Sequence, residues 1–182
     1  MEEQEVPTEH LHEHMEHHAK HSGERWTMGV ALSSALLAAL AAVGSLQAGH
    51  HANEAMISQI SAANQWSYFQ SKSIKESQLK AKLDVLDALG KPAAAADHAK
   101  LEEYKTDKEK IQATAEGKEK EAEHELKAHQ VFARSVTLFQ IAISLGAISV
   151  LTKRPKFWLV SLGLGVTGLV FFVQAFLLAA SH

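Results

Sequence analysis

Three long runs of apolar residues without a single charged side chain limit the folds that this chain can adopt. They occupy residues 26–48, 135–152 and 157–180 of a sequence of 182 residues. A helix of about 20 residues crosses the roughly 30 Å hydrocarbon core of a bilayer, so each run has a suitable length. The sequence therefore predicts an integral membrane protein with transmembrane helices at 26–48, 133–152 and 156–180.

A polar and charged stretch, residues 49–132, separates the first two runs and contains one breaker cluster, Gly90-Lys91-Pro92. If the chain folds back there, His50 lies opposite Phe132 and the flanking runs enter one bilayer side by side. Pro92 is then expected at the first position of the returning helix. We expect an all-α fold: three transmembrane helices with a long extramembrane antiparallel helical hairpin, a coiled coil, between the first and the second.

One face of the outgoing arm should form the apolar seam of this hairpin. Met56, Ile60 and Ala63 share a face because they are spaced by three and four residues, and Leu79, Leu83 and Leu86 form another stretch of it. The returning arm is dense in Lys and Glu away from its own apolar positions, and we interpret those charges as a solvated surface.

Large rings follow on the outgoing arm at Trp66, Tyr68 and Phe69. The fold-back register places small residues of the returning arm, within 113–117, opposite Trp66. We therefore expect these small residues, Ala113, Ala115 and Gly117, to make room for the rings, and we predict a contact surface formed by the rings and Gly117.

Small residues recur at every fourth position of the first apolar run, in the rows Ala31-Ala35-Ala39 and Ser34-Ala38-Ala42. Such rows let helix backbones approach closely in lipid, although an alanine-rich composition alone would also produce them. One row suffices for a neighbour in the same chain. We therefore predict a cyclic homo-oligomer with this run nearest its axis and with Ala35 and Ala38 in the contact.

Histidines gather in two places. The polar segment 1–25 is rich in His and Glu, and residues one helical turn apart there have the spacing of two-histidine metal pairs. The candidate ligands are His10, His14, His17, His18 and His21. The alternative is a solvated amphipathic helix with surface histidines.

A second group, His50, His51 and His129, is expected at the membrane boundary. There it could form a proton-sensing or metal-binding belt, because histidine titrates near neutral pH. Alternatively, these side chains simply lie at the level of the lipid headgroups.

Several classes of function have no support in the sequence. There is no cysteine, and no nucleophile–base set, phosphate loop or cofactor motif, so we expect neither an enzyme nor a cofactor. The formal net charge of −3, with no long basic run, argues against nucleic acid as a partner. The partners we expect are the lipid bilayer and further copies of the chain.

The orientation follows from the short loop at 153–156, which contains three basic residues. Short loops rich in Lys and Arg stay on the cytoplasmic side. We therefore predict a cytoplasmic N-terminus and a hairpin on the opposite side of the membrane, which for the inner membrane of a bacterium is the periplasm.

Several short motifs resemble a bacterial membrane-protein family catalogued as domain of unknown function 4337. They are VPTE at 6–9, ERW at 24–26, GHHANEA at 49–55, QWSYFQSKSIK at 65–75 and LTKR at 151–154. The resemblance implies a small bacterial membrane protein and brings no activity, ligand or site residues. Two hypotheses follow: a non-enzymatic homo-oligomer with a structural or sensory role, or a homo-oligomeric channel or transporter with a pore on the oligomer axis.

Overall fold

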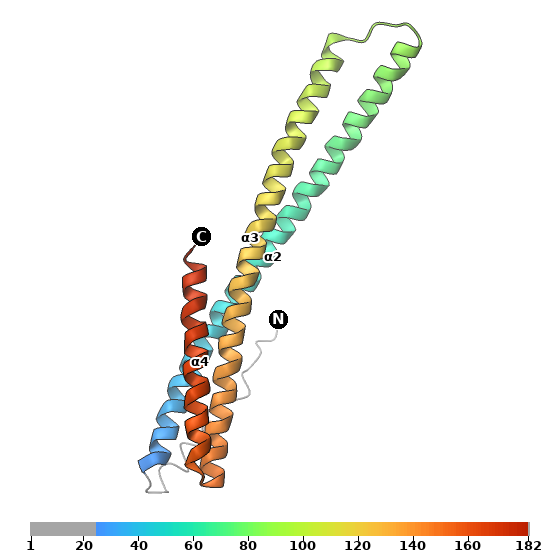
Figure 1. Cartoon of the computed structure of the whole chain (residues 1–182). Helices are drawn as coiled ribbons and strands as arrows, with labels where there is room; N and C mark the ends of the chain where they lie inside the picture. Colours follow the sequence, from blue (N-terminus) through green and yellow to red (C-terminus); the bar gives the residue numbers. More distant parts are fainter. Residues whose placement is uncertain (1–24, 182) are drawn as a thin grey trace. The chain divides into compact units, whose positions relative to one another are not determined.

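The computed structural model describes residues 25–181, which form three helices: α2 (Arg25–Ala88), α3 (Ala95–Thr152) and α4 (Pro155–Ala179) (Figure 1). No strand occurs among these residues, which confirms the predicted all-α class. Each helix contains a segment that is long and apolar enough to cross a membrane. The first apolar run ends within α2 and the second begins within α3, so α2 continues from its apolar part into its polar part without a break.

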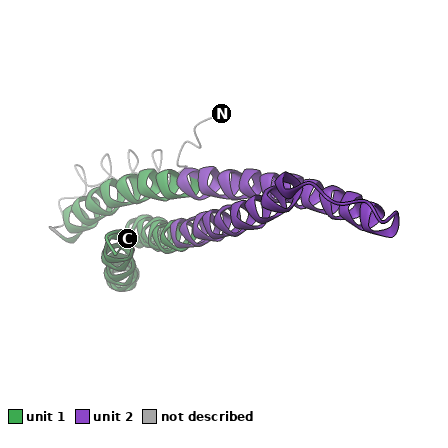
Figure 2. Cartoon of the chain, turned by 90° about the horizontal axis from the view of Figure 1, so that it is seen from above, with its two compact units in different colours: residues 1–52, 126–182 green, residues 53–125 purple. Residues whose placement is uncertain are grey.

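The chain divides into two compact units, which are described separately (Figure 2). Unit 1 contains α2 up to Ala52, α3 from Leu126 onwards, and α4. Unit 2 contains residues Asn53–Glu125, which are the polar parts of α2 and α3 with the turn between them.

The turn between α2 and α3 occurs at the predicted breaker cluster. Gly90 has a φ of +64°, the left-handed conformation that glycine adopts without steric cost. The Gly90 amide donates to the carbonyl of Asp87 and the Lys91 amide to that of Leu86, which is a Schellman cap. The prediction that Pro92 begins the next helix is wrong. Residues 91–94 are not helical, and α3 begins at Ala95.

The second turn uses a lysine where glycine is usual. Lys153 has a φ of +52°, and the amides of Lys153 and Arg154 donate to the carbonyls of Val150 and Ser149. This is again a Schellman cap. Arg154 is extended, as the residue before a proline prefers, and Pro155 stands at the start of α4.

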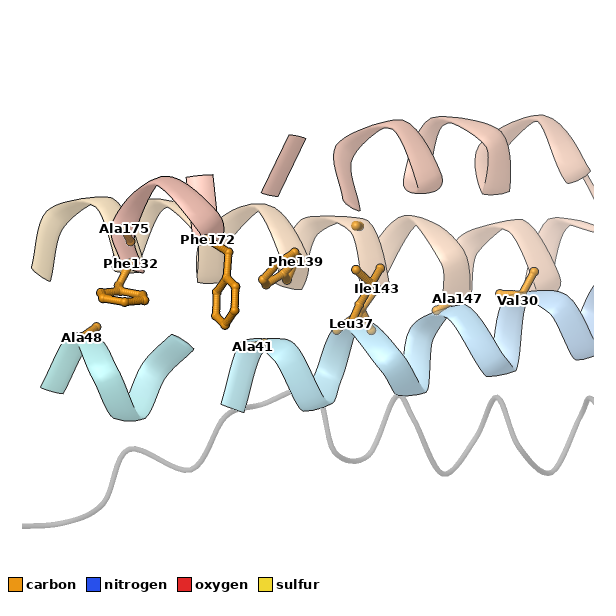
Figure 3. Packing of buried hydrophobic residues seen from close by; sticks show 11 residues of the cluster. Val30, Leu37, Ala41, Ala48, Phe132, Phe139, Ile143, Ala147, Phe172 and Ala175 are labelled. Carbon is orange, nitrogen blue, oxygen red and sulfur yellow. The ribbon is translucent and has the colours of Figure 1, made fainter. Parts of the chain in front are cut away.

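The core of unit 1 consists of interlocking aromatic and small side chains from its three helices (Figure 3). Phe132, Phe139 and Ile143 of α3 are fully buried. The ring of Phe132 meets those of Phe172 and Phe176 of α4 edge to face, with centroids 6.0 and 5.1 Å apart. This geometry aligns the positive edge of one ring with the negative face of the next.

Glycines allow the helices of unit 1 to approach one another. A Cβ on Gly168 of α4 would lie 2.8 Å from ring carbons of Phe139, and one on Gly44 of α2 would lie 2.8 Å from Val136. A Cβ on Gly146 of α3 would lie 3.1 Å from the hydroxyl oxygen of Ser34. At Gly168 and Gly44 any larger residue would push packed side chains apart.

Most hydroxyl groups in the apolar segments donate to carbonyls of their own helix. Ser149 and Ser144, for example, donate to the carbonyls of Gly146 and Gln140. Between helices, Ser161 of α4 donates to the carbonyl of Ala142 at 2.6 Å, and the indole of Trp158 donates to Ser33 at 3.2 Å. These polar groups therefore need no water inside an apolar environment.

The row of α2 that packs on α3 in unit 2 differs from the predicted one near the start of the unit, whereas the predicted Leu79, Leu83 and Leu86 are half-buried. Ala55, Ser58 and Ala62 are buried, whereas Met56 and Ile60 are 61% and 56% exposed. Both rows have three- and four-residue spacing. The smaller side chains occupy the contact because they let the two backbones approach.

Candidate interaction surfaces

Unit 2 is held together by a cluster of aromatic and charged side chains that we call the aromatic–charge cluster. It contains Trp66, Tyr68, Phe69, Lys72 and Glu76 of α2 with Tyr104, Asp107, Lys108 and Glu119 of α3. The indole of Trp66 donates to Glu119 at 2.8 Å and meets the ring of Phe69 edge to face. The hydrogen bond from Trp66 to Glu119 joins α2 to α3 and so helps to fix their register.

Lys72 is the centre of one half of the cluster. Its ammonium group lies 2.6 Å from Oδ2 of Asp107, with the rings of Tyr68 and Tyr104 at 5.5 and 5.3 Å. The hydrogen bond that Lys72 donates to Asp107 raises the pKa of Lys72 although burial opposes it, and the same bond lowers the pKa of Asp107. Both groups therefore stay charged over the whole range near neutrality.

Glu76 is the centre of the other half and is buried. Lys108 of α3 donates to it at 2.8 Å, and Lys80, one turn further along α2, lies 2.6 Å from its other oxygen. The hydrogen bonds from Lys108 and then Lys80 lower the pKa of Glu76 to about 2. Lys108 also lies over the ring of Phe69 at 5.1 Å. Two ammonium groups thus share the one carboxylate, and because Lys108 and Glu76 lie on different helices the arrangement links α2 to α3.

Gly117 does not receive the aromatic rings. It is exposed, and a Cβ built on it would meet nothing within 4 Å. The prediction that it makes room for Trp66 is therefore wrong for contacts within one chain. Trp66 reaches Glu119 instead, while Ala115 lies in the buried row of α3.

The three boundary histidines have different environments in unit 1. The Nδ1 of His129 lies 2.8 Å from the carbonyl oxygen of Ala48, and this nitrogen must carry the proton because a carbonyl only accepts. His51 stacks on Phe132 with centroids 5.5 Å apart and planes 11° apart. His50 is exposed and contacts the ring of His51. His129 and His51 therefore take part in contacts between helices. This arrangement favours neither a metal site nor a proton site shared by the three histidines.

Metal ligands do not converge in the part of the chain that the structure describes. Residues 25–181 contain no group of three or more His, Cys, Asp or Glu side chains arranged to hold an ion. The predicted ligands in the first segment, His10, His14, His17, His18 and His21, lie outside the described residues.

A row of exposed residues runs along the face of α2 that does not contact α3 in unit 2. We call it the α2 stripe. Its members alternate in spacing between three and four residues: Asn53, Ile57, Ile60, Asn64, Ser67, Ser71, Ile74, Gln78, Ala81, Val85 and Ala88. None of them is charged, and all except half-buried Ser71 are exposed. Ile57, Ile74 and Val85 are 58–59% exposed, which is unusual for side chains that water disfavours.

The predicted contact residues of the first apolar run divide between two environments. Ala38 packs against the core of its own chain, and Ala35 is half-buried. The exposed positions of this part of α2 carry both large and small side chains: Leu32 and Leu36 are 74% and 63% exposed, and Ala39 and Ala42 of the two small-residue rows are also exposed. A role for Ala35 and Ala38 in self-association stays a prediction.

Comparison with known proteins gives one match. A family model described as Domain of unknown function (DUF4337) matches residues 10–178. The chain belongs to this family. The family region includes α2, α3, all but the last residue of α4, the aromatic–charge cluster and the α2 stripe. No curated protein and no solved structure matches the chain significantly. Because the family description assigns no activity, function must be inferred from the surfaces themselves.

Proposed function

We propose that this member of the DUF4337 family is a subunit of a non-enzymatic homo-oligomeric assembly in the bacterial inner membrane, with a structural or sensory role. The apolar parts of α2, α3 and α4 would be transmembrane helices. Residues 53–125 would form an extramembrane antiparallel helical hairpin of coiled-coil type. The basic turn at Lys153 and Arg154 supports a cytoplasmic N-terminus and a periplasmic hairpin.

The observation that carries this proposal is the α2 stripe. Exposed aliphatic side chains in the apolar parts of the helices would be covered by lipid, but those of residues 53–88 would face water. Ile57, Ile60 and Ile74 are each more than half exposed there. Exposed isoleucines that share one face of a helix in water are typical of a protein–protein contact.

Measurement of the particle mass tests the proposal. The full chain would be solubilised in several mild detergents and its mass determined by light scattering coupled to size exclusion, with the detergent contribution subtracted. A multiple of the 19.9 kDa chain mass is expected. A monomer in every detergent, and also after cross-linking in intact membranes, would contradict it.

A channel or transporter is the second candidate, and the polar members of the α2 stripe favour it. Asn53, Asn64 and Gln78 would line the axis of a ring if the stripe faced inward. Exposed positions in the apolar part of α2 are occupied by Leu32, Leu36 and similar residues, which would close such an axis within the bilayer. Ion flux from liposomes containing the purified protein separates the two candidates, because only a channel gives flux above that of empty liposomes.

A further inference from the structure

We infer that the α2 stripe is the contact along which copies of this chain pack parallel and in register, helix α2 against helix α2. This inference rests on the proposed function and specifies the surface, the partner and the direction. The partner is a second copy of the same chain.

The spacing of the stripe identifies the kind of partner. An isolated α-helix has 3.6 residues per turn, so residues that alternate by three and four drift slowly around it. Such a row stays in contact over many turns only with another helix that winds around it with the same repeat. In unit 2 the stripe keeps this spacing from Asn53 to Ala88, and the row of α2 that faces α3 lies on a different side of the helix. The surface is therefore suited to a long helix rather than to a globular partner.

The continuation of the pattern along α2 indicates a second copy in the same orientation. The three- and four-residue spacing extends back through His50, Leu46, Val43, Ala39, Leu36 and Leu32, all of which are exposed. The row thus changes from purely apolar to partly polar near His50, where the predicted transmembrane segment ends. In a parallel copy of the same chain in the same membrane, the row changes from apolar to partly polar at the same depth. Apolar residues of one copy therefore contact apolar residues of the other, and polar residues contact polar residues.

The charges beside the stripe allow such packing. One flank carries the exposed lysines Lys75 and Lys82, and the other carries Asp84 with uncharged Gln70 and Ser77. When parallel copies pack side by side, the lysine flank of one meets the flank with Asp84 of the next. Like charges do not face each other, which removes the main electrostatic obstacle to the contact.

The polar residues of the stripe explain why two copies would pack in one register. Asn64 and Gln78 stand at positions where a coiled coil is usually apolar. Such residues weaken a contact but fix its register, because a shifted neighbour would leave their amide groups unpaired. In-register copies bring each amide opposite its own counterpart, where the carbonyl and the amino group of two copies can pair.

Cysteine cross-linking of the full chain in membranes tests the inference, since the chain has no cysteine of its own. The stripe variants are Ser67→Cys and Gln78→Cys, and the matched controls are Gln59→Cys and Asp87→Cys, exposed positions of the same helix off the stripe. Mild oxidation is expected to give at least about five-fold more disulfide dimer for both stripe variants than for the controls. The two stripe positions are about 16 Å apart at 1.5 Å per residue, so an antiparallel contact could self-link at no more than one of them.

Each outcome has a distinct meaning. Equal or faster cross-linking at the controls, or self-linking at only one stripe position, overturns the inference. An oligomeric particle mass combined with unlinked stripe variants overturns the stripe contact and leaves the proposed function standing. A monomeric mass overturns both. Circular dichroism of each variant confirms that the helices are intact before the cross-linking yields are compared.

Discussion

Alanine in place of Gly168 would add a methyl group where α4 meets the ring of Phe139. The new Cβ would lie 2.8 Å from two ring carbons of Phe139 and 3.3 Å from the Cβ of Leu138. The Phe139 ring is fully buried, so it has no free space into which to turn. Gly163 on the same helix is the matched control, because a Cβ there would meet no heavy atom within 4 Å.

The magnitude follows from two opposing effects. Each substitution gains helix propensity, since glycine in a helix interior is about 1 kcal/mol less favourable than alanine. Overpacking of a filled core costs about 1–3 kcal/mol, and only Gly168→Ala incurs this cost. The propensity gain cancels when the variants are compared with each other, so Gly168→Ala should be less stable than Gly163→Ala by about 1–3 kcal/mol.

The free energy of unfolding can be measured by titrating protein in mild-detergent micelles with a denaturing detergent while following tryptophan fluorescence. Phe139→Leu provides a further control, because it removes ring atoms that the new methyl group would meet. The double variant Gly168→Ala with Phe139→Leu should lose less stability than the sum of the losses of the two single variants. Equal midpoints for Gly168→Ala and Gly163→Ala would refute the close approach of α3 and α4 at this point.

Three further predictions concern the turns, the charges and the orientation. Lys153→Gly should be more stable than Lys153→Ala by about 1–2 kcal/mol in the same unfolding assay, because both remove the charge but only glycine adopts positive φ without steric cost; equal stabilities would argue against the left-handed turn. Because the folded-state pKa of Glu76 is lowered to about 2, its ion pairs should stabilise unit 2 above the ordinary carboxyl pKa near 4.5 and lose that effect as the pH falls from there towards 2. Glu76→Gln should therefore lower the free energy of unfolding by about 1–3 kcal/mol at neutral pH, the range for hydrogen bonds to charged groups. It should also flatten the acid dependence of hydrogen-exchange protection in unit 2. Glu103→Gln, in a half-exposed pair with Lys100, should leave that dependence unchanged. Cysteine at Ala95 should react with a membrane-impermeant thiol reagent added to cells with a permeabilised outer membrane, whereas cysteine at Ser22 should not, and the reverse pattern would invert the proposed orientation.

Helix ends could be predicted from the sequence because single residues determine them. Gly90 provides the left-handed residue of the first turn, and Pro155 begins α4 after an extended Arg154. Pro92 was misassigned because a proline suits the first turn of a helix and also the connection before it. Only the hydrogen bonds of the Gly90 cap, which leave residues 91–94 outside a helix, distinguish these two positions.

Helix faces could not be predicted in the same way. In α2 the rows that begin at Ala55 and at Met56 have the same spacing, so periodicity alone cannot tell which one contacts α3. The prediction chose the row with Met56 and Ile60, whereas the structure buries Ala55, Ser58 and Ala62. The pairs Lys72–Asp107 and Glu76–Lys108 were missed for a related reason, because charges on polar arms are usually solvated and only the packed arrangement brings these together.

The exposed isoleucines of α2 also bear on how a cell would control the amount of this protein. Ile57, Ile60 and Ile74 lie on a surface that promotes aggregation and proteolytic degradation of the chain when no other subunit covers it. If copies of the chain cover one another, a newly made subunit is vulnerable until it meets others. Scarce subunits would then be degraded before they assemble, and abundant ones would protect each other. The steady-state level would rise more steeply than the rate of synthesis, so a modest change in expression could switch the assembly between nearly absent and fully formed.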